Sequence, residues 1–189
     1  RNSIGARILE SIIREIFEVK FIQTDPNPAN FFYNTVTGDL NLLNFVAARG
    51  YSEEFVNEYL QTVYGASNND AALVLRSTTA LGFLTGEESK VMIEAHIESV
   101  LVVGLPFSEL GEFDFGNQGM TKRIYKLMPV MMKNRLKAPP KEVYSLHRKL
   151  AGAYLLNMML KTKIPARGIF HKVLKEINPA WLKGKVLKS

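Results

Sequence analysis

The 189-residue sequence contains no cysteine. This absence excludes a disulfide scaffold, a thiolate metal site and a cysteine nucleophile. The longest largely apolar runs, Val100–Leu105 and Tyr154–Leu160, are far shorter than the roughly 18 residues of a membrane span. A composition of 47% apolar and 22% charged residues excludes disordered and low-complexity classes. Because the chain opens on Arg1 in a helical pattern, with no recognisable signal or transit peptide, we expect a processed or truncated start.

Acidic residues are scarce in the last third of the chain. Residues 1–119 hold 7 Lys and Arg against 16 Asp and Glu, a net charge of −9. Residues 120–189 hold 17 Lys and Arg against only Glu142 and Glu176, a net charge of +15. This asymmetry leaves two interpretations open: a solvated basic face, or a face for anionic lipid, nucleic acid or an acidic partner. No aromatic-interleaved basic motif is present, so we predict no nucleic-acid partner.

The apolar spacing predicts a mainly helical chain. Two prolines exclude a helix interior within Gln23–Asn30, which is expected to be an ordered loop. Two short strands, Phe31–Tyr33 and Leu40–Phe45, are predicted to form a hairpin through Asn34–Asp39. The capping box Thr85–Glu88 is expected to open a helix. The expected helices span residues 3–20, 52–64, 69–80, 85–103, 121–136, 139–161 and 165–177, with a loop at 104–119. The helix at 121–136 is expected to be kinked or broken near Pro129.

The loop carries the residues best suited to chemistry. Asp25 and Asn30 have the spacing D-x-x-x-x-N, and the hairpin follows at once. This is the layout of a protein-kinase catalytic loop and metal loop. A carboxylate has to lie beside the group that attacks a phosphate, while an amide oxygen from the same turn has to face Mg²⁺.

The segment from Phe21 to Phe31 resembles the catalytic loop of the UbiB family of atypical kinases, the coenzyme Q biosynthesis group of mitochondria and bacteria. Gln-Thr-Asp-Pro-Asn, at residues 23–27, resembles the mitochondrial branch. The further matches occur in the family's order at Phe83–Gly86, Ala95–His96, Pro106–Phe107, Phe113–Gly116 and Pro139–Lys149. The resemblance runs from about residue 4 to 177 and implies a mainly α, protein-kinase-like C-lobe with one small β-hairpin after the catalytic loop.

The resemblance implies that Asp25 is the catalytic-loop aspartate and that Asn30 is a metal ligand. A second metal ligand is expected at Asn44, where the family pattern has the Asp of an Asp-Phe-Gly triplet. Asn44 offers a neutral amide oxygen where Mg²⁺ gains most from an anionic one. Val46 replaces the glycine of the triplet, and a β-branched residue tolerates positive φ poorly. The position is therefore interpreted as degenerate.

The resemblance covers only the C-lobe. Residues 1–177 are predicted to form it, with 1–51 carrying the catalytic and metal-loop region and 52–177 the helical subdomain, followed by a basic tail at 178–189. A kinase also needs an N-lobe with a phosphate loop and a strand lysine. We therefore expect no cofactor in this chain alone, and Mg-ATP or Mg-ADP if the protein is active with an N-lobe.

Two functions remain open. The favoured one is a catalytically impaired pseudokinase, a structural or interaction subunit of a larger mitochondrial assembly linked to coenzyme Q biosynthesis. The alternative is an active ATP-binding protein or ATPase that supports coenzyme Q biosynthesis. By resemblance, the expected location is the matrix side of the mitochondrial inner membrane. Expected partners are proteins that cover the open cleft or the basic C-terminal third, or an anionic membrane surface.

Other conspicuous residues are interpreted as structural. Asp114–Gly116 spells the kinase triplet but lies 89 residues beyond Asp25, so a turn is favoured over a metal role. His96 is expected to be buried and hydrogen-bonded, and His147 to be packed. Trp181 lies in a tail that is expected to be disordered rather than membrane-bound. The methionines expected to fill the core are Met128, Met131, Met132, Met158 and Met159.

Overall fold

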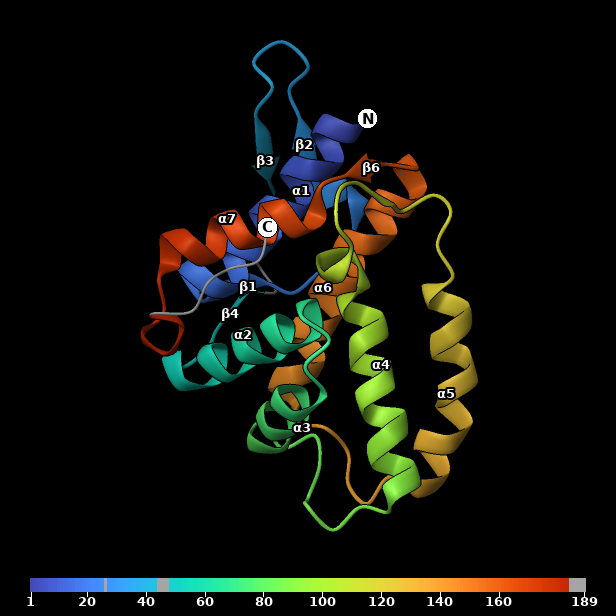
Figure 1. The fold of residues 1–189 in the computed structure, drawn as a ribbon. Helices are drawn as coiled ribbons and strands as arrows, with labels where there is room; N and C mark the ends of the chain where they lie inside the picture. The colour runs from blue at the N-terminus through green and yellow to red at the C-terminus, as the bar shows by residue number, and fades with distance from the viewer. Residues whose placement is uncertain (26, 44–47, 184–189) are drawn as a thin grey trace.

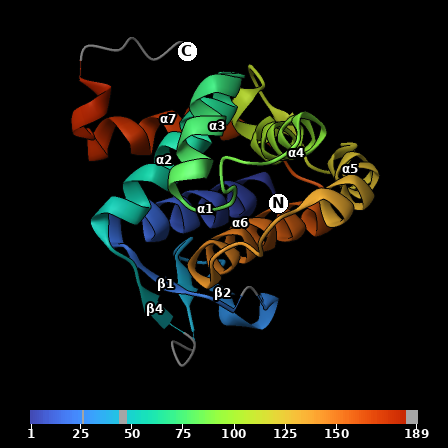
Figure 2. The same cartoon turned by 90° about the horizontal axis from the view of Figure 1, so that it is seen from below.

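The computed structural model describes residues 1–25, 27–43 and 48–183. Within these residues the chain is dominated by α-helices, which pack around one apolar core (Figures 1 and 2). The mainly α prediction is therefore confirmed. The helices are α1 (Asn2–Arg14), α2 (Glu53–Ser67), α3 (Ala71–Ala80), α4 (Lys90–Ser108), α5 (Met120–Asn134), α6 (Lys141–Leu160) and α7 (Ala166–Ile177).

Short strands form three antiparallel pairs in the described part of the chain. The predicted hairpin is present as β2 (Phe31–Tyr33) and β3 (Leu40–Leu42), and it projects from the molecule beside α1 (Figure 1). The other two pairs were not predicted, because strands of two or three residues are too short to show an alternating pattern. They join β1 (Phe21–Gln23) to β4 (Ala48–Gly50), and β5 (Phe113–Asp114) to β6 (Lys163–Ile164).

The first helix begins and ends close to its predicted limits. α1 continues as a π-helical turn, Glu15–Val19, which stops at Lys20 in the left-handed region. Its apolar stripe, including Leu9, Ile12 and Ile16, is fully buried. The stripe packs between α6 and α7, so it forms the centre of the core.

The predicted start of the fourth helix is wrong. α4 begins at Lys90 with Ser89 as its N-cap, and Glu88 instead closes the preceding turn. Its carboxylate accepts hydrogen bonds from Thr85 N at 2.7 Å, Thr85 Oγ1 at 2.9 Å and Gly86 N at 3.0 Å. The residues predicted as a capping box therefore form hydrogen bonds with one another in a turn that precedes the helix.

The predicted end of this helix is also wrong, since α4 runs through the expected loop as far as Ser108. Pro106 lies in its last turn, where the missing N–H removes only one hydrogen bond. Burial of Phe107 in the core favours the helical path. α4 is the one described helix that is long and apolar enough to cross a membrane, yet it packs against α2, α3, α5 and α7. A core helix meets the same criteria.

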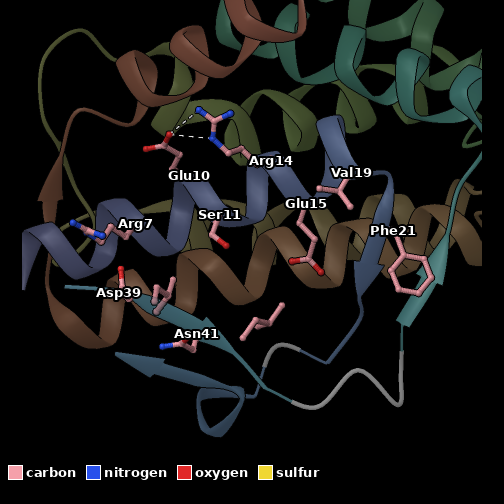
Figure 3. Close-up of a pocket in the computed structure, with 11 residues that line it drawn as sticks. Arg7, Glu10, Ser11, Arg14, Glu15, Val19, Phe21, Asp39 and Asn41 are labelled. Carbon is pink, nitrogen blue, oxygen red and sulfur yellow. Dashed lines mark hydrogen bonds and ion pairs between the residues drawn. The ribbon is translucent and has the colours of Figure 1, made fainter. Parts of the chain in front are cut away.

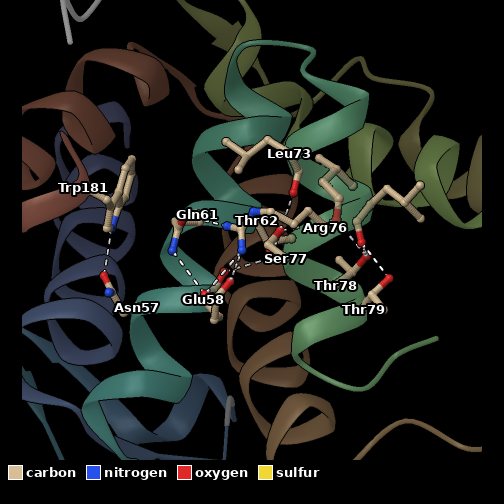
Figure 4. Close-up of polar contacts among 12 residues, drawn as sticks. Asn57, Glu58, Gln61, Thr62, Leu73, Arg76, Ser77, Thr78, Thr79 and Trp181 are labelled. Carbon is tan, nitrogen blue, oxygen red and sulfur yellow. Dashed lines mark hydrogen bonds and ion pairs between the residues drawn. The ribbon is translucent and has the colours of Figure 1, made fainter. Parts of the chain in front are cut away.

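Polar contacts join α2 to α3 (Figure 4). The hydroxyls of Thr62 and Ser77 lie 2.8 Å apart in the buried interface. At its edge, Arg76 forms an ion pair with Glu58 at 3.2 Å. On the other side of α2 the crossing with α4 is tight, because a Cβ on Gly104 would lie 2.4 Å from the Cβ of Ala66.

The end of the described chain is packed, so the expectation of a disordered tail is wrong for residues 178–183. A 3₁₀ turn, Ala180–Leu182, follows α7. Trp181 Nε1 donates to Asn57 Oδ1 at 2.8 Å, as Figure 4 shows, and the indole packs edge-on against Tyr64. Residues 184–189 lie outside the described part of the chain.

The expectation that the five methionines fill the core is wrong. Met132 and Met159 are 77% and 71% exposed, Met128 is exposed, and Met131 and Met158 are only partly buried. The spacing of apolar residues did not show that these methionines would be exposed. α5 packs chiefly against α4, and its other apolar side is left uncovered. The open side forms part of a groove described below.

All three histidines have lowered pKa values, and two of them, His96 and His147, lie side by side at the core. Burial lowers the pKa of His96 to about 4, helped by the charge of Arg135, and the same two causes lower the pKa of His147 to about 4. Both rings pack against Phe83. His96 is buried as expected, but its Nε2 has no hydrogen-bond partner. Both histidines are therefore neutral in the folded protein near neutral pH.

We predict an acid-sensitive core. In the unfolded chain these histidines are protonated below about pH 6.5, whereas in the folded chain they stay neutral until the pH falls to about 4. Their contribution to stability is thus complete above pH 6.5 and is lost as the pH falls toward 4, by about 1–3 kcal/mol for each histidine. Urea unfolding of the parent and of His96→Leu at several pH values tests this. The variant should lose less stability than the parent between pH 6.5 and 4.5; equal losses would assign the effect to carboxylates instead.

Candidate functional site

The loop with the predicted catalytic residues begins and ends in regular structure. β1 leads into it, a 3₁₀ turn at Pro28–Asn30 closes it, and β2 follows directly. β1 pairs with β4 in an antiparallel ladder, so the strand that enters the loop lies beside the strand that comes after the hairpin. The hydrogen bond from Leu43 N to Asn30 O, at 2.7 Å, brings the end of the hairpin back to the loop. Asn44 and Val46, the degenerate positions, lie outside the described residues.

The structure brings Asp25 and Asn30 together. Asn30 Nδ2 donates to Asp25 Oδ2 at 3.0 Å and to Asp25 O at 3.2 Å. Asp25 Oδ1 accepts from Asn27 N at 3.3 Å, and Asn27 Oδ1 accepts from Ala29 N at 3.0 Å. Asn30 is buried and Asp25 is partly buried. The loop is therefore an internally hydrogen-bonded unit in which the amide orients the carboxylate.

The described residues do not by themselves fit a kinase-type Mg²⁺ site. Such a site takes oxygen ligands from a metal-loop carboxylate and a catalytic-loop amide, together with the substrate phosphates. Here Asp25 supplies one carboxylate, and the amide nitrogen of Asn30, rather than its oxygen, faces it. No group of three acidic, histidine or cysteine side chains that could hold a metal occurs among the described residues. We therefore derive no chemical step through a metal from this geometry.

A buried lysine, which the sequence analysis did not identify, contacts the residues that flank the loop. Lys149, on α6, has a fully buried side chain whose Nζ lies 3.0 Å from Glu15 Oε2. The same Nζ donates to Gln23 Oε1 at 3.1 Å and lies 5.6 Å from the centre of the Phe31 ring. Glu15 also accepts a hydrogen bond from Gln23 N. Lys149 thus contacts the residues on both sides of the loop.

The electrostatics of Lys149 reflect this position. Burial lowers its pKa, while the carboxylates of Glu15 and Asp25 oppose that effect. A signal was available in the sequence, because Lys149 falls among the apolar positions Val143, Leu146 and Leu150 of its helix. A cation at a core position requires a buried partner. The sequence could not say which of the acidic residues provides it.

An open cavity of about 760 Å³ lies between α1 and β3 (Figure 3). Glu15 lines it, so it adjoins the lysine network, but Asp25 and Asn30 do not. Arg14, also in its wall, is held by ion pairs to Glu10 and Glu18 at 3.0 and 2.8 Å. Phe32, which follows the loop on β2, is exposed. The surface beside the loop is therefore open and partly apolar.

Asp114–Gly116 forms a turn, as interpreted from the sequence. Asp114 Oδ1 accepts from Gly116 N at 2.9 Å, and its Oδ2 lies 2.9 Å from Lys163 Nζ. This ion pair is the main cause of the lowered pKa of Asp114. Phe115 is buried against Tyr154. The Asp114 carboxylate is thus occupied by contacts with Lys163 on β6 and with the backbone of its own turn.

Comparisons with known proteins bear on this loop and on the fold. Residues 1–78 match the model of the ABC1 atypical kinase-like domain. The chain is 46% identical over 170 residues to the atypical kinase COQ8B, mitochondrial, of Danio rerio, covering 90% of this chain and 27% of that protein. It is 37% identical over 175 residues to the atypical kinase COQ8, mitochondrial, of Saccharomyces cerevisiae, covering 92% and 35% respectively.

A solved structure is also similar. The complex of Rv3197 with erythromycin from Mycobacterium tuberculosis matches with a TM-score of 0.64 and 16% identity, covering 97% of this chain and 44% of that one. At this identity the likeness shows the fold alone. Together with the family match, it confirms the prediction of a mainly α, kinase-like C-lobe with a hairpin after the loop. The chain spans about a quarter to a third of the length of these two curated relatives.

We predict that Lys149→Met destabilises the protein and loosens the loop. Removing the cation leaves Glu15, whose side chain is 11% exposed at the edge of the cavity, without its charge partner, which costs up to about 3–5 kcal/mol. Arg148→Met, which removes an exposed cation one residue away, is the matched control and should cost under about 1 kcal/mol. Urea unfolding measures both, and hydrogen exchange of residues 23–31 reports on the loop.

The double variant Glu15→Gln/Lys149→Met separates charge from packing. Removing both charges should recover a large part of the lost stability, because no unpaired ion then remains buried. Equal stability of Lys149→Met and Arg148→Met would contradict the role given to the buried pair.

Proposed function

We propose that the chain is the C-lobe of a catalytically impaired member of the ABC1 family of atypical kinase-like proteins, a pseudokinase. The observation that carries the proposal is the shortage of anionic ligands. Asp25 is the only carboxylate that the loop offers among the described residues, and Asn44 replaces the aspartate expected in the metal loop. A neutral amide binds Mg²⁺ more weakly than a carboxylate does.

The proposed setting follows the names of the relatives. The matched curated proteins from Danio rerio and Saccharomyces cerevisiae are named mitochondrial COQ8-type atypical kinases. We extend this to a mitochondrial protein linked to coenzyme Q biosynthesis, on the matrix side of the inner membrane. The activity and partners of the whole protein are part of the same proposal, since this chain corresponds to only a fraction of those relatives.

In this proposal the chain acts as a structural or interaction subunit. The open surface beside the loop, with exposed Phe32, suits a covering protein segment. The basic last third offers a second contact face, for a protein or for an anionic membrane surface. No nucleotide or metal is needed for either contact.

The second candidate is an active ATP-binding protein or ATPase that supports coenzyme Q biosynthesis once an N-lobe is present. One observation favours it: the Asp25–Asn30 pair is kept in an ordered, hydrogen-bonded loop that Lys149 supports from below. Mg-ATP or Mg-ADP would be the ligand in that case. Asp25 would orient the attacking group, and Asn30 would hold that carboxylate in place.

The test compares nucleotide binding and ATP turnover in the full-length protein. We expect little turnover in the parent and at least about a tenfold gain in Asn44→Asp/Val46→Gly, because the change restores an anionic ligand and a flexible backbone. Adding Asp25→Asn to that variant should abolish the gain.

The parent and the single variant Asp25→Asn provide the decisive comparison. Robust turnover in the parent that Asp25→Asn removes would establish the second candidate. Turnover that Asp25→Asn leaves unchanged would point to a contaminating ATPase and leave the pseudokinase proposal standing.

A further inference from the structure

An apolar groove opens between α5 and α6, away from the catalytic loop. Its volume is about 400 Å³, and α4 forms its floor. The wall on α5 includes Ile124, Tyr125 and Met128, and the wall on α6 includes Leu155 and Met158. The chain returns from α5 to α6 through residues 135–140, so the two helices form an open hairpin (Figure 1). The groove is the space that this hairpin leaves unfilled.

The exposed side of α6 carries the spacing of a helix-packing seam. Tyr144, Arg148, Ala151, Leu155 and Met159 follow one another at intervals of four, three, four and four residues, and all are exposed. Tyr144 and Leu155 are 67% and 58% exposed. A stripe with three- and four-residue intervals is the pattern with which helices interlock side chains. The small side chain of Ala151 in the groove wall allows another backbone to approach closely.

The charges beside the groove are of one sign. Lys122, Lys126 and Lys133 share the outer face of α5, which lies beyond the rim residue Tyr125 and outside the groove lining. None of the three lysines forms an ion pair within the described residues, whereas Arg123 pairs with Glu98 on α4 at 2.5 Å. α5 contains no acidic residue. These lysines therefore offer cations to the edge of an occupant that extends over the rim at Tyr125.

The shape favours a helix over a flat bilayer surface. The floor residue Val102 and the wall residue Tyr154 are buried, while the apolar rims stand exposed on both sides. A flat surface would touch the rims and leave the concavity empty. A helix packs against neighbouring helices at about 8–10 Å between axes and fills such a space. The methionine-rich lining adapts readily to a partner's side chains.

We propose that this groove binds an amphipathic α-helix of a partner protein, with an apolar face against α5 and α6 and an acidic edge against the lysine stripe. The 15 residues of α5 correspond to about 22 Å, which sets the partner helix at about four turns. This docking site does not depend on whether the loop binds nucleotide, because none of its residues belongs to the loop.

The probe is a designed 18-residue amphipathic peptide with a leucine face and glutamates along one edge. It is titrated into the full-length protein without nucleotide, and fluorescence anisotropy gives the Kd. A second peptide with lysines on that edge is the charge control. The glutamate peptide should bind at least about tenfold more tightly at low salt, and the difference should shrink at high salt because the cations are exposed.

Two variants locate the binding. Leu155→Glu places a charge in the groove wall, and Lys122→Glu/Lys126→Glu reverses the stripe; each should weaken binding of the glutamate peptide at least about tenfold. Leu110→Glu, at a leucine outside the groove that is 70% exposed against 58% for Leu155, should leave it unchanged. Thermal unfolding checks that the variants fold, and the lysine variant alters only surface residues if Leu155→Glu does not.

Three outcomes would overturn the proposal. They are no binding of the glutamate peptide, binding that neither groove variant weakens, and equal binding of both peptides. Vesicles containing 30% anionic phospholipid form a parallel arm. Vesicle binding that Leu155→Glu abolishes, with no peptide binding, would assign the face to a membrane instead.

Discussion

The arrangement of the candidate site depends on one buried ion pair, Lys149 with Glu15. Burying two charges is costly, and the cost is offset only where hydrogen bonds satisfy the remaining donors and acceptors. Gln23 makes one such hydrogen bond to each partner: its side-chain oxygen accepts from Lys149, and its backbone N–H donates to Glu15. The pair therefore joins the first helical segment, α6 and the strand before the loop into one unit. The Asp25–Asn30 turn sits on this unit and adds its own internal hydrogen bonds.

α6 contributes residues both to the candidate site and to the apolar groove. Its buried face carries Lys149 beneath the loop, and its exposed face carries the seam with Leu155 beside the groove. A partner helix in the groove would contact the same rigid element that supports Asp25. Both proposals describe a chain whose apolar and charged surfaces are suited to covering by other segments. That agrees with a chain spanning about a third or less of its matched relatives from Danio rerio and Saccharomyces cerevisiae.

Much of the site was predictable because it is local. Asp25 and Asn30 lie five residues apart, and the prolines between them exclude a helix, so a turn has to bring them together. Lys149 lies more than a hundred residues from Gln23, and no local pattern pairs them. The start of α4 could not be predicted from the sequence, because Ser89 and Thr85 are both good caps. In the structure Glu88 accepts hydrogen bonds from the turn at Thr85, and Ser89 caps the helix. The roles of Asn30 and Asn44 as metal ligands stay predictions.

The helical class, the loop with its hairpin and the charge asymmetry could all be predicted from the sequence, because each depends on short spacings or on composition. Only the tertiary structure decided which apolar stripes are buried and which acid neutralises Lys149. Periodicity shows that a helix has an apolar face but not whether a neighbour covers it. Met128 and Met132 met the same sequence criterion as core residues, and they remained exposed because α5 found a partner in α4 and not in α6.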